Sequence, residues 1–450
     1  MYGPKSKAYP SGIVTNCTLP RTVENVKEHL EPGRFYHDVS TERVLYVPLA
    51  GQDMAKATAV LAVEEQLVHL SGATGHTFDG IAFEHATWLR PGQGPGYVEA
   101  QAGACDLCPT KLPVHGCVSP DYAGDYESLI PGNVAVTNGS RGIEFVDCQF
   151  RHLGAAAAST RGGSQGIAWR RCSFEDVSAG AVVLGDVIDT GPETDANSTT
   201  PTERWDMNLT VEDCTIANLP VEYSGATAIF AGYVAGARIQ HNLIVNTSAN
   251  AIALGWGWGR DGSGRGDNHV LANRIDGVGL ERCCDLGAIY TLGPQPRSTI
   301  RFNHIMQRTT PTTAFCPNCF DGNASEGMAI YHDNGSGGFV DSQNVIEGIW
   351  DIALLVHTTL GPFGPSTGQC PGCDGATNSS CCDIVFSSNW LHSAHGVWPP
   401  STQAGGTTPA KSSWFKVQDD NTVVPAAEAL PAAAAAIVVA AGPRSETGRV

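Results

Sequence analysis

The stretches RIQHNLI (Arg238–Ile244), VLANRI (Val270–Ile275) and IRFNHI (Ile300–Ile305) decide the fold of this chain. Each places an asparagine between short apolar segments, and the three asparagines are spaced 31 and 30 residues apart. Short strands that repeat at such a spacing, with one residue type at a fixed place, are typical of a coiled solenoid. Because one coil cannot bury its apolar face alone, successive coils stack and their strands pair in parallel.

The same phrase continues in both directions as FVDCQF, AWRRCSF, TVEDCTI, VDSQNVI and FSSNWL. We call the central residue of each phrase the pivot; the pivots are Cys148, Cys172, Cys214, Asn242, Asn273, Asn303, Asn344 and Asn389. Stacked strands lie about 4.8 Å apart, so neighbouring asparagine pivots can hydrogen-bond along the stack. The sequence therefore predicts an all-β fold, a right-handed parallel β-helix. The alternative, a β-sandwich, does not repeat one residue type at one place.

A second set of strands follows the pivots after turns of small residues. The aligned segments are Ala181–Gly185, Ala228–Gly232, Ala251–Gly255, Gly287–Thr291, Met328–His332 and Ile352–Val356. Their nearly continuous apolar character is typical of strands that are covered on both faces. In this alignment Tyr290 and Tyr331 occupy equivalent positions on adjacent coils, so we expect them to stack.

Three regions follow from the pattern. Residues 1–70 lack the repeat and contain a predicted β-hairpin between Pro32 and Met54, residues 71–425 form the β-helix, and residues 426–450 form an Ala-rich helical cap. We interpret the first region as the end of a truncated inserted domain. Insertions near residues 89–132, 186–206, 308–326 and 358–380 are expected to gather on one face, where binding sites normally lie.

Composition restricts the function. The net charge of −18 argues against nucleic acid and against polyanionic substrates, so a neutral ligand fits better. The sequence has no run of eighteen or more apolar residues, and we expect no membrane-spanning segment. We further expect a monomer that uses neither a metal nor another cofactor.

Asparagine sequons and cysteines suggest a secreted or otherwise extracytoplasmic glycoprotein whose signal peptide lies outside this chain. Eight Asn-X-Ser/Thr sequons and 15 cysteines are present. The pivots Cys148, Cys172 and Cys214 are expected to point inward as free thiols. The cysteines of the insertions, including CPNC and CPGC, are predicted to form disulfides, with a zinc site as the alternative.

Three phrases carry side chains suited to chemistry: GWGWGRDG, with Trp256 and Trp258; CCDLGAIY, with Asp285; and AIYHDNGSGG, with His332 and Asp333. Tryptophan rings at a surface loop can stack on the faces of sugars, or they can pack beneath an insertion. Together with Tyr290, Tyr331 and His357, the two tryptophans and His332 are the predicted substrate-binding residues.

A glycosidase needs two carboxyl groups, and Asp285 and Asp333 are the candidate catalytic pair because they flank equivalent strands of adjacent coils. One difficulty concerns the strand register. Asp285 precedes its strand whereas Asp333 follows the neighbouring one, and straight strands would hold them well apart. Asp186, Asp261 and Glu222 are the substitutes.

The phrases FDGIAFEHATW, GWGWGRDG, DLGAIYTLGPQP and IYHDNGSGG, in this order, resemble the right-handed β-helix enzymes of the glycoside hydrolase family 141 group. That group includes an α-L-fucosidase and xylan-degrading enzymes. The resemblance extends over most of the chain from Pro32. It implies a β-helix fold, hydrolysis of a carbohydrate and a catalytic aspartate pair, for which Asp285 and Asp333 are the matching positions.

The leading hypothesis is therefore a glycoside hydrolase that acts on a neutral poly- or oligosaccharide. One alternative is a carbohydrate-binding or structural β-helix without turnover, in which the two aspartates would be dispensable. The other is a polysaccharide lyase or epimerase. Such an enzyme normally uses a Lys or Arg base, and the 27 Lys and Arg residues form no cluster near the second strand.

Overall fold

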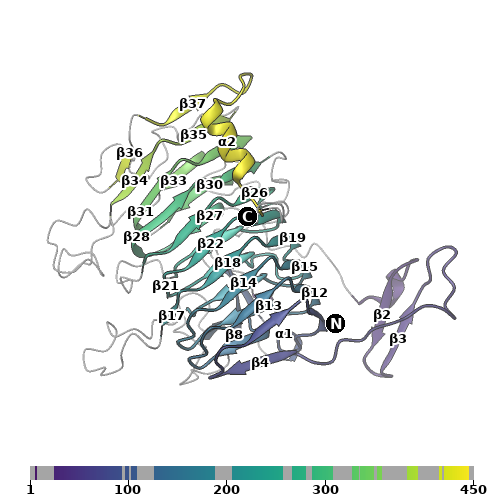
Figure 1. Cartoon of the computed structure of the whole chain (residues 1–450). Helices are drawn as coiled ribbons and strands as arrows, with labels where there is room; N and C mark the ends of the chain where they lie inside the picture. The colour runs from purple at the N-terminus through teal and green to yellow at the C-terminus, as the bar shows by residue number, and fades with distance from the viewer. Residues whose placement is uncertain are drawn as a thin grey trace.

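The computed structural model describes residues 6–7, 25–93, 97–100, 103–108, 126–187, 205–256, 266–279, 286–307, 327–333, 335–348, 352–356, 383–393, 415–417 and 420–444. Most of the strands belong to three parallel sheets that wind around one core, as Figure 1 shows. The predicted parallel β-helix is confirmed. We call the sheets sheet 1, sheet 2 and sheet 3, in the order in which each coil crosses them.

Sheet 1 has nine strands and contains all six segments of the second strand set. Its strands are β4 (Val68–Ser71), β10 (Gly132–Thr137), β13 (Ala156–Thr160), β16 (Val182–Leu184), β20 (Ile229–Ala231), β24 (Ile252–Leu254), β27 (Leu286–Thr291), β30 (Gly327–His332) and β33 (Ile352–Val356). Every neighbouring pair is parallel and in register, so equivalent residues form rows that run along the stack.

Sheets 2 and 3 have ten strands each and meet at the pivots. Sheet 2 comprises β5 (Thr77–Asp79), β11 (Glu144–Val146), β14 (Ala168–Arg170), β18 (Thr210–Glu212), β22 (Arg238–Gln240), β25 (His269–Leu271), β28 (Pro294–Arg301), β31 (Gly337–Ser342), β34 (Ile384–Ser387) and β36 (Phe415–Val417). Sheet 3 comprises β6 (Ala82–Ala86), β12 (Gln149–Leu153), β15 (Ser173–Val177), β19 (Thr215–Leu219), β23 (Leu243–Thr247), β26 (Arg274–Asp276), β29 (His304–Gln307), β32 (Val345–Gly348), β35 (Trp390–Ser393) and β37 (Thr422–Val424).

The corner between sheets 2 and 3 has the same construction in successive coils. The residue before each pivot has a positive φ, near 50–60°, which turns the chain sharply; these residues are Asp147, Arg171, Asp213, His241, Ala272, Phe302, Gln343 and Ser388. The pivot then points inward and is buried. Repetition of this turn keeps every coil in the same orientation.

The asparagine pivots form a ladder of hydrogen bonds. Asn303 Nδ2 donates to Asn344 Oδ1 at 3.0 Å and to the Val270 carbonyl, while Asn303 Oδ1 accepts from both the side-chain and the backbone nitrogen of Asn273. Equivalent bonds run from Asn242 to Asn421, a further pivot that the sequence analysis did not identify. The buried polar groups are thus satisfied by their neighbours in the stack.

In the earlier coils the pivots are cysteines instead of asparagines. Cys148, Cys172 and Cys214 are buried and free, as predicted. The neighbouring thiol of Cys172 and burial both raise the pKa of Cys148, so its thiol stays protonated. The insertion cysteines lie outside the residues whose side chains are described, and whether they form disulfides or a zinc site stays a prediction.

The N-terminal hairpin and the first insertion lie outside the coils. The predicted hairpin is present as β2 (Phe35–Asp38) and β3 (Arg43–Tyr46), which pair antiparallel and project from the side of the stack in Figure 1. The 3₁₀ turn η1 (Lys27–His29) precedes it. In the first insertion, α1 (Arg90–Gln93) leads to the antiparallel strands β7 (Tyr97–Ala100), β8 (Gly103–Cys108) and β9 (Tyr126–Leu129), with β1 (Ser6–Lys7) beside β7. The short pair β17 (Asp206–Met207) and β21 (Val234–Ala235) lies between sheets 1 and 2.

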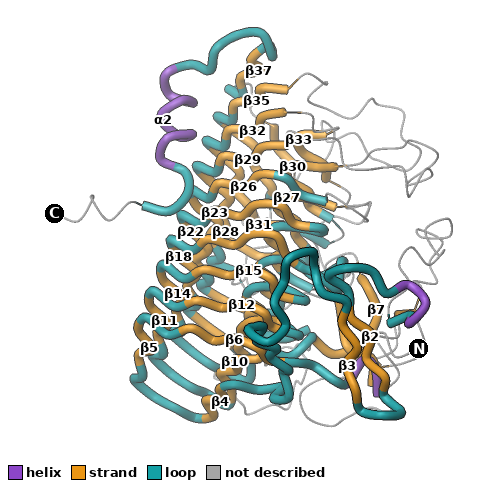
Figure 2. The backbone as a smooth tube through the Cα atoms, turned by 90° about the vertical axis from the view of Figure 1, so that its right-hand side faces the viewer, coloured by secondary structure: helices purple, strands orange, loops and turns teal. Residues whose placement is uncertain are grey.

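The Ala-rich segment forms helix α2 (Ala432–Ala440), which packs beside β32 instead of closing the end of the last coil. The chain after β37 runs back along the stack, as Figure 2 shows. Gly442 N donates to the carbonyl of Ala272 at 2.9 Å, and the Arg444 guanidinium pairs with Asp213. We call residues 425–444 the C-terminal strap.

The contact with Arg444 also changes the pKa of Asp213. Burial alone would raise this pKa, but the hydrogen bonds from Arg444 outweigh burial and lower it.

We predict that Asn303→Ala lowers the free energy of unfolding by about 2–4 kcal/mol, because it removes four hydrogen bonds and leaves the buried backbone N–H of Asn273 without its acceptor. Guanidinium unfolding measures the change. Thr215→Ala, at an exposed position of β19, is the control and should stay within about 0.5 kcal/mol. Equal effects of the two substitutions would contradict a stabilising role for the ladder.

A second prediction concerns acid stability. Glu347 of β32 contacts His304 at 2.5 Å and His392 at 3.0 Å. The hydrogen bond with His304, opposed by burial and aided by His392, lowers the pKa of Glu347 from 4.5 to about 2. A depressed carboxyl pKa stabilises the fold above the unfolded value, so this contribution, on the order of 2 kcal/mol, is lost as the pH falls from about 4.5 to about 2.

Unfolding of the native chain and of Glu347→Gln, followed between pH 7 and pH 2, measures this contribution. The variant should be less stable at pH 6 and should lose less stability on acidification. Parallel pH profiles for the two proteins would show that Glu347 contributes nothing.

Candidate functional site on the outer face of sheet 1

One row of side chains on the outer face of sheet 1 includes both predicted tyrosines. The strand register aligns Val183, Phe230, Ala253, Tyr290 and Tyr331, one from each of five adjacent strands. Alternation along each strand turns the preceding residues, such as Ile289 and Ile330, into the core. The row itself belongs to a second apolar cluster outside the core.

The two tyrosines meet as predicted from the alignment. Their ring centroids lie 5.1 Å apart at an interplanar angle of 89°, an edge-to-face contact. They are 0% and 1% exposed, so this wall of the solenoid is covered in the structure.

Asp333 lies on the same outer face, directly after β30 and two residues beyond Tyr331. Its carboxylate Oδ2 accepts a 2.5 Å hydrogen bond from the phenol of Tyr290. Its backbone N–H donates to the Thr291 carbonyl at 3.1 Å, and its carbonyl accepts from Ser336 N at 3.0 Å. Asp333 is only 2% exposed. The end of β30 therefore fixes a buried carboxyl group against the tyrosine pair.

His332 points in the opposite direction, into the solenoid. It occupies the inward row between Thr291 and Val356. Its Nε2 contacts Asp341 Oδ2 at 2.6 Å, its Nδ1 contacts Thr291 Oγ1 at 2.8 Å, and the side chain is 0% exposed. This placement leaves His332 no surface for direct contact with a substrate.

Trp256 follows β24 and packs its ring edge to face against Phe230, with the centroids 5.9 Å apart. It is 8% exposed, so the packing alternative describes Trp256 in this structure. The other predicted site residues, Asp285, Trp258 and His357, lie outside the described residues, as does the substitute Asp261.

The register of β27 and β30 bears on the proposed aspartate pair. Leu286, the first residue of β27, lies opposite Gly327, which is six residues before Asp333. At about 3.3 Å per residue, the beginning of β27 is roughly 20 Å from Asp333 along the strand direction. The register between β27 and β30 that the sequence alignment predicted is confirmed. The wide separation that it implied between the beginning of β27 and the end of β30 is therefore present in the structure.

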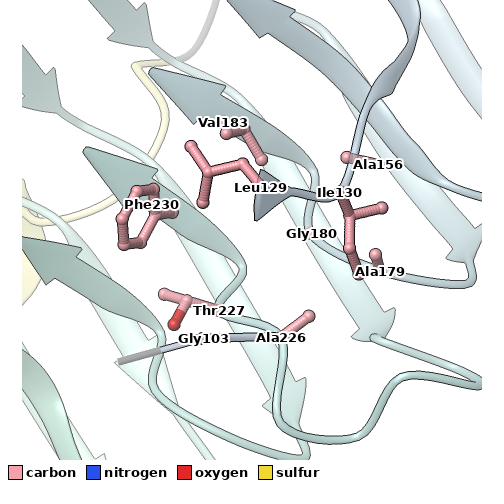
Figure 3. A pocket seen from close by; sticks show the side chains of 10 residues that line it. All are labelled: Gly103, Leu129, Ile130, Ala156, Ala179, Gly180, Val183, Ala226, Thr227 and Phe230. Carbon is pink, nitrogen blue, oxygen red and sulfur yellow. The ribbon is translucent and has the colours of Figure 1, made fainter. Parts of the chain in front are cut away.

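The first insertion covers another part of the outer face and borders a pocket, drawn in Figure 3. In Figure 3, Leu129, the last residue of β9, lies toward Val183 and Phe230 of sheet 1, while Ile130 lies toward Ala179 and Gly180. Among the described lining residues Thr227 supplies the only polar side chain. The pocket can accept an apolar group, but it brings no acid or base to a substrate.

A second buried carboxyl group lies between sheets 1 and 2. Asp206 Oδ1 accepts hydrogen bonds from the backbone N–H groups of Gly163 and Ser164, at 2.8 and 2.9 Å. Burial, opposed by these hydrogen bonds and aided by the charge of Asp186, raises the pKa of Asp206 to about 6. The sequence analysis named Asp186 as a substitute and missed Asp206, whose bonds hold a turn. Glu222, the other described substitute, is exposed.

Asp341 was also missed, although the sequence contains a signal for it. The third residue before the pivot is apolar in the neighbouring phrases, as with Ile300 and Phe386, and the register aligns both with Asp341. An aspartate at that position replaces an apolar core residue. Comparison of the phrases column by column would have identified it.

Comparisons with known proteins add one finding. No family model matches the chain, and no curated protein matches it. A solved structure described as a glycoside hydrolase is similar, with a TM-score of 0.65 and 21% sequence identity. The match covers 94% of this chain and 61% of that one, so this chain spans about three fifths of the length of its structural relative. At this identity the likeness shows the fold.

No group of three or more His, Cys, Asp and Glu side chains in the described part of the chain is arranged to hold a metal ion. No helix among the described residues is long and apolar enough to cross a membrane.

We predict that Tyr290→Phe lowers the free energy of unfolding by about 1.5–3 kcal/mol, because a phenol–carboxylate hydrogen bond in a buried site is lost while the ring packing is kept. Thermal and denaturant melts measure the change. Tyr331→Phe is the matched comparison, since it keeps the bond between Tyr290 and Asp333 and should cost less. Equal losses in the two variants would argue against this bond as an anchor of Asp333.

Proposed function

We propose that the protein is a glycoside hydrolase that acts on a neutral poly- or oligosaccharide, with Asp333 as one of its two catalytic carboxyl groups. The observation that carries the proposal is the placement of Asp333. Its carboxylate lies on the outer face of sheet 1 at the end of β30 and is bound by Tyr290. The structural likeness to a glycoside hydrolase and the resemblance to the family 141 group support the same reaction.

The mechanism requires a second carboxyl group. One group protonates the glycosidic oxygen, while the other attacks the anomeric carbon or activates a water molecule. Asp285 is the proposed partner because it matches the second aspartate of the family 141 pattern. The adjacent residue, Leu286, lies roughly 20 Å from Asp333 along the strand direction, so this pairing requires that the chain before β27 turn back toward Asp333. A separation of about 5–5.5 Å between the two groups would give retention of configuration, and about 6.5–9.5 Å would give inversion.

Charge supports a neutral substrate. At a net charge of −18, the protein repels uronate-rich polymers over long range. A neutral chain pays no such penalty and can bind through aromatic rings and hydrogen bonds. The aromatic row beside Asp333 is covered in the structure, so hydrolysis requires that this wall become accessible to a sugar.

That burial also favours a second candidate function, a carbohydrate-binding or structural β-helix without turnover. In this case the contact between Asp333 and Tyr290 serves only to close the wall of sheet 1. The two functions differ in what happens when the carboxylate is removed, because a structural contact affects stability and a catalytic group affects turnover.

The test is hydrolysis of aryl glycosides and neutral polysaccharides, headed by fucosides, xylosides and xylan. Asp333→Asn should lower turnover by about 10²–10⁴-fold, the range for loss of an acid–base group, with the circular dichroism spectrum unchanged. Asp79→Asn, an exposed aspartate of β5, is the control and should keep native turnover. Native turnover in Asp333→Asn would exclude it as a catalytic group. A folded native chain that cleaves none of the substrates would favour the binding function.

A further inference from the structure

Beneath Asp333, four fully buried polar side chains form a continuous chain inside the solenoid. Asp341 Oδ2 contacts His332 Nε2 at 2.6 Å, and His332 Nδ1 contacts Thr291 Oγ1 at 2.8 Å. Thr291 Oγ1 contacts Ser336 Oγ at 2.9 Å. All four side chains are 0% exposed.

The number of hydroxyl hydrogens determines which group donates and which accepts in each hydrogen bond of this chain. The Ser336 hydroxyl donates to the Thr291 carbonyl at 2.8 Å, so its oxygen must accept from the Thr291 hydroxyl. Thr291 Oγ1 has then used its only hydrogen, and it accepts one from His332 Nδ1. The contact between Nε2 and Asp341 Oδ2, at 2.6 Å, forms the other end of the chain.

The chain ends at the backbone that carries Asp333. The Thr291 carbonyl accepts both the Ser336 hydroxyl and the N–H of Asp333, and Ser336 N donates back to the Asp333 carbonyl. With the bond from Tyr290 to the carboxylate, Asp333 is held at its nitrogen, its carbonyl and its side chain. His332, the adjacent residue, anchors the end of β30 from the interior.

Packing alone does not explain why polar side chains occupy these positions. A buried ion pair is often no more stable than well-packed apolar residues of similar volume. Apolar residues align with Asp341 on both sides, namely Ile300 and Phe386. His332 aligns with the apolar Val356 on one side and with Thr291, itself a member of the chain, on the other. The polar side chains therefore occur together in the coil that carries Asp333 and in the coil before it.

We propose that His332, Asp341, Thr291 and Ser336 are positioning residues that fix the carboxyl group of Asp333 for catalysis, an inference that rests on the proposed function of Asp333. They touch no substrate. His332 acts through the end of β30, and Asp341 acts through His332. The assignment replaces the sequence-based expectation that His332 contacts the substrate directly.

The decisive variant is the double substitution His332→Leu/Asp341→Ile, which introduces apolar side chains like those of the aligned residues Val356 and Ile300. We expect its melting temperature to equal or exceed the native value. Its kcat should fall by about 10- to 100-fold with KM changed less than about threefold, because a displacement near 1 Å at a catalytic group is enough for such a loss.

Two single variants complete the set. Asp341→Asn keeps a hydrogen-bonding partner for His332 Nε2 and should retain most of the native kcat. His304→Gln removes a contact between a comparably buried histidine and Glu347 on sheet 3; it should lower stability and leave kcat unchanged.

Crystal structures of the native chain and of the double variant provide a readout that needs no substrate. The distance between Tyr290 Oη and Asp333 Oδ2, 2.5 Å in the native chain, should lengthen in the variant. An unmoved Asp333 together with native kcat would overturn the positioning role. If the native chain hydrolyses no sugar, the proposed function fails, while the displacement or immobility of Asp333 in the two structures still decides whether these residues position it.

Discussion

The in-register parallel stacking of the coils, held at one corner by the ladder of pivot side chains, is the constraint on which the rest of the structure depends. Each asparagine pivot from Asn242 onward bonds the next one at 2.9–3.0 Å, which prevents one coil from sliding against another. Because a slip of one residue would exchange the inner and outer faces, the ladder also determines which side chains face outward on sheet 1. Tyr290 and Tyr331 meet for this reason, and Asp333 comes within reach of the phenol of Tyr290.

The same constraint explains how much of the fold could be predicted from the sequence. A stacked repeat has a visible period, so the pivots, the strand sets of all three sheets and the pairing of Ala288 with Ala329 could be aligned without any structure. The free, inward thiols of Cys148, Cys172 and Cys214 followed from the same alignment. The C-terminal strap could not be placed, because its contacts with Ala272 and Asp213 join positions that no period relates.

The candidate site was less predictable, because its chemistry depends on the direction of side chains and on hydrogen bonds between coils. Sequence reasoning chose Asp333 and Tyr290 but had no means to see that one binds the other. It grouped His332 with the substrate-binding residues from its proximity in sequence, whereas alternation along β30 turns His332 inward and Asp333 outward. Asp341 could have been found by comparing the repeated phrases position by position, because it replaces an apolar residue in an otherwise apolar row.

The C-terminal strap changes how such a molecule comes apart. In an ordinary solenoid each coil contacts only its neighbours, so the stack can fray from an end, one repeat at a time. Here Arg444 holds Asp213 across a sequence separation of 231 residues, and the strap passes over the coils between them. The coils that follow Asp213 cannot separate from the stack until the contact between Arg444 and Asp213 breaks. The later half of the stack is therefore coupled into one cooperative unit. Such a long-range contact adds little to the speed of folding, but it makes the finished coil stack resistant to unravelling from its C-terminal end.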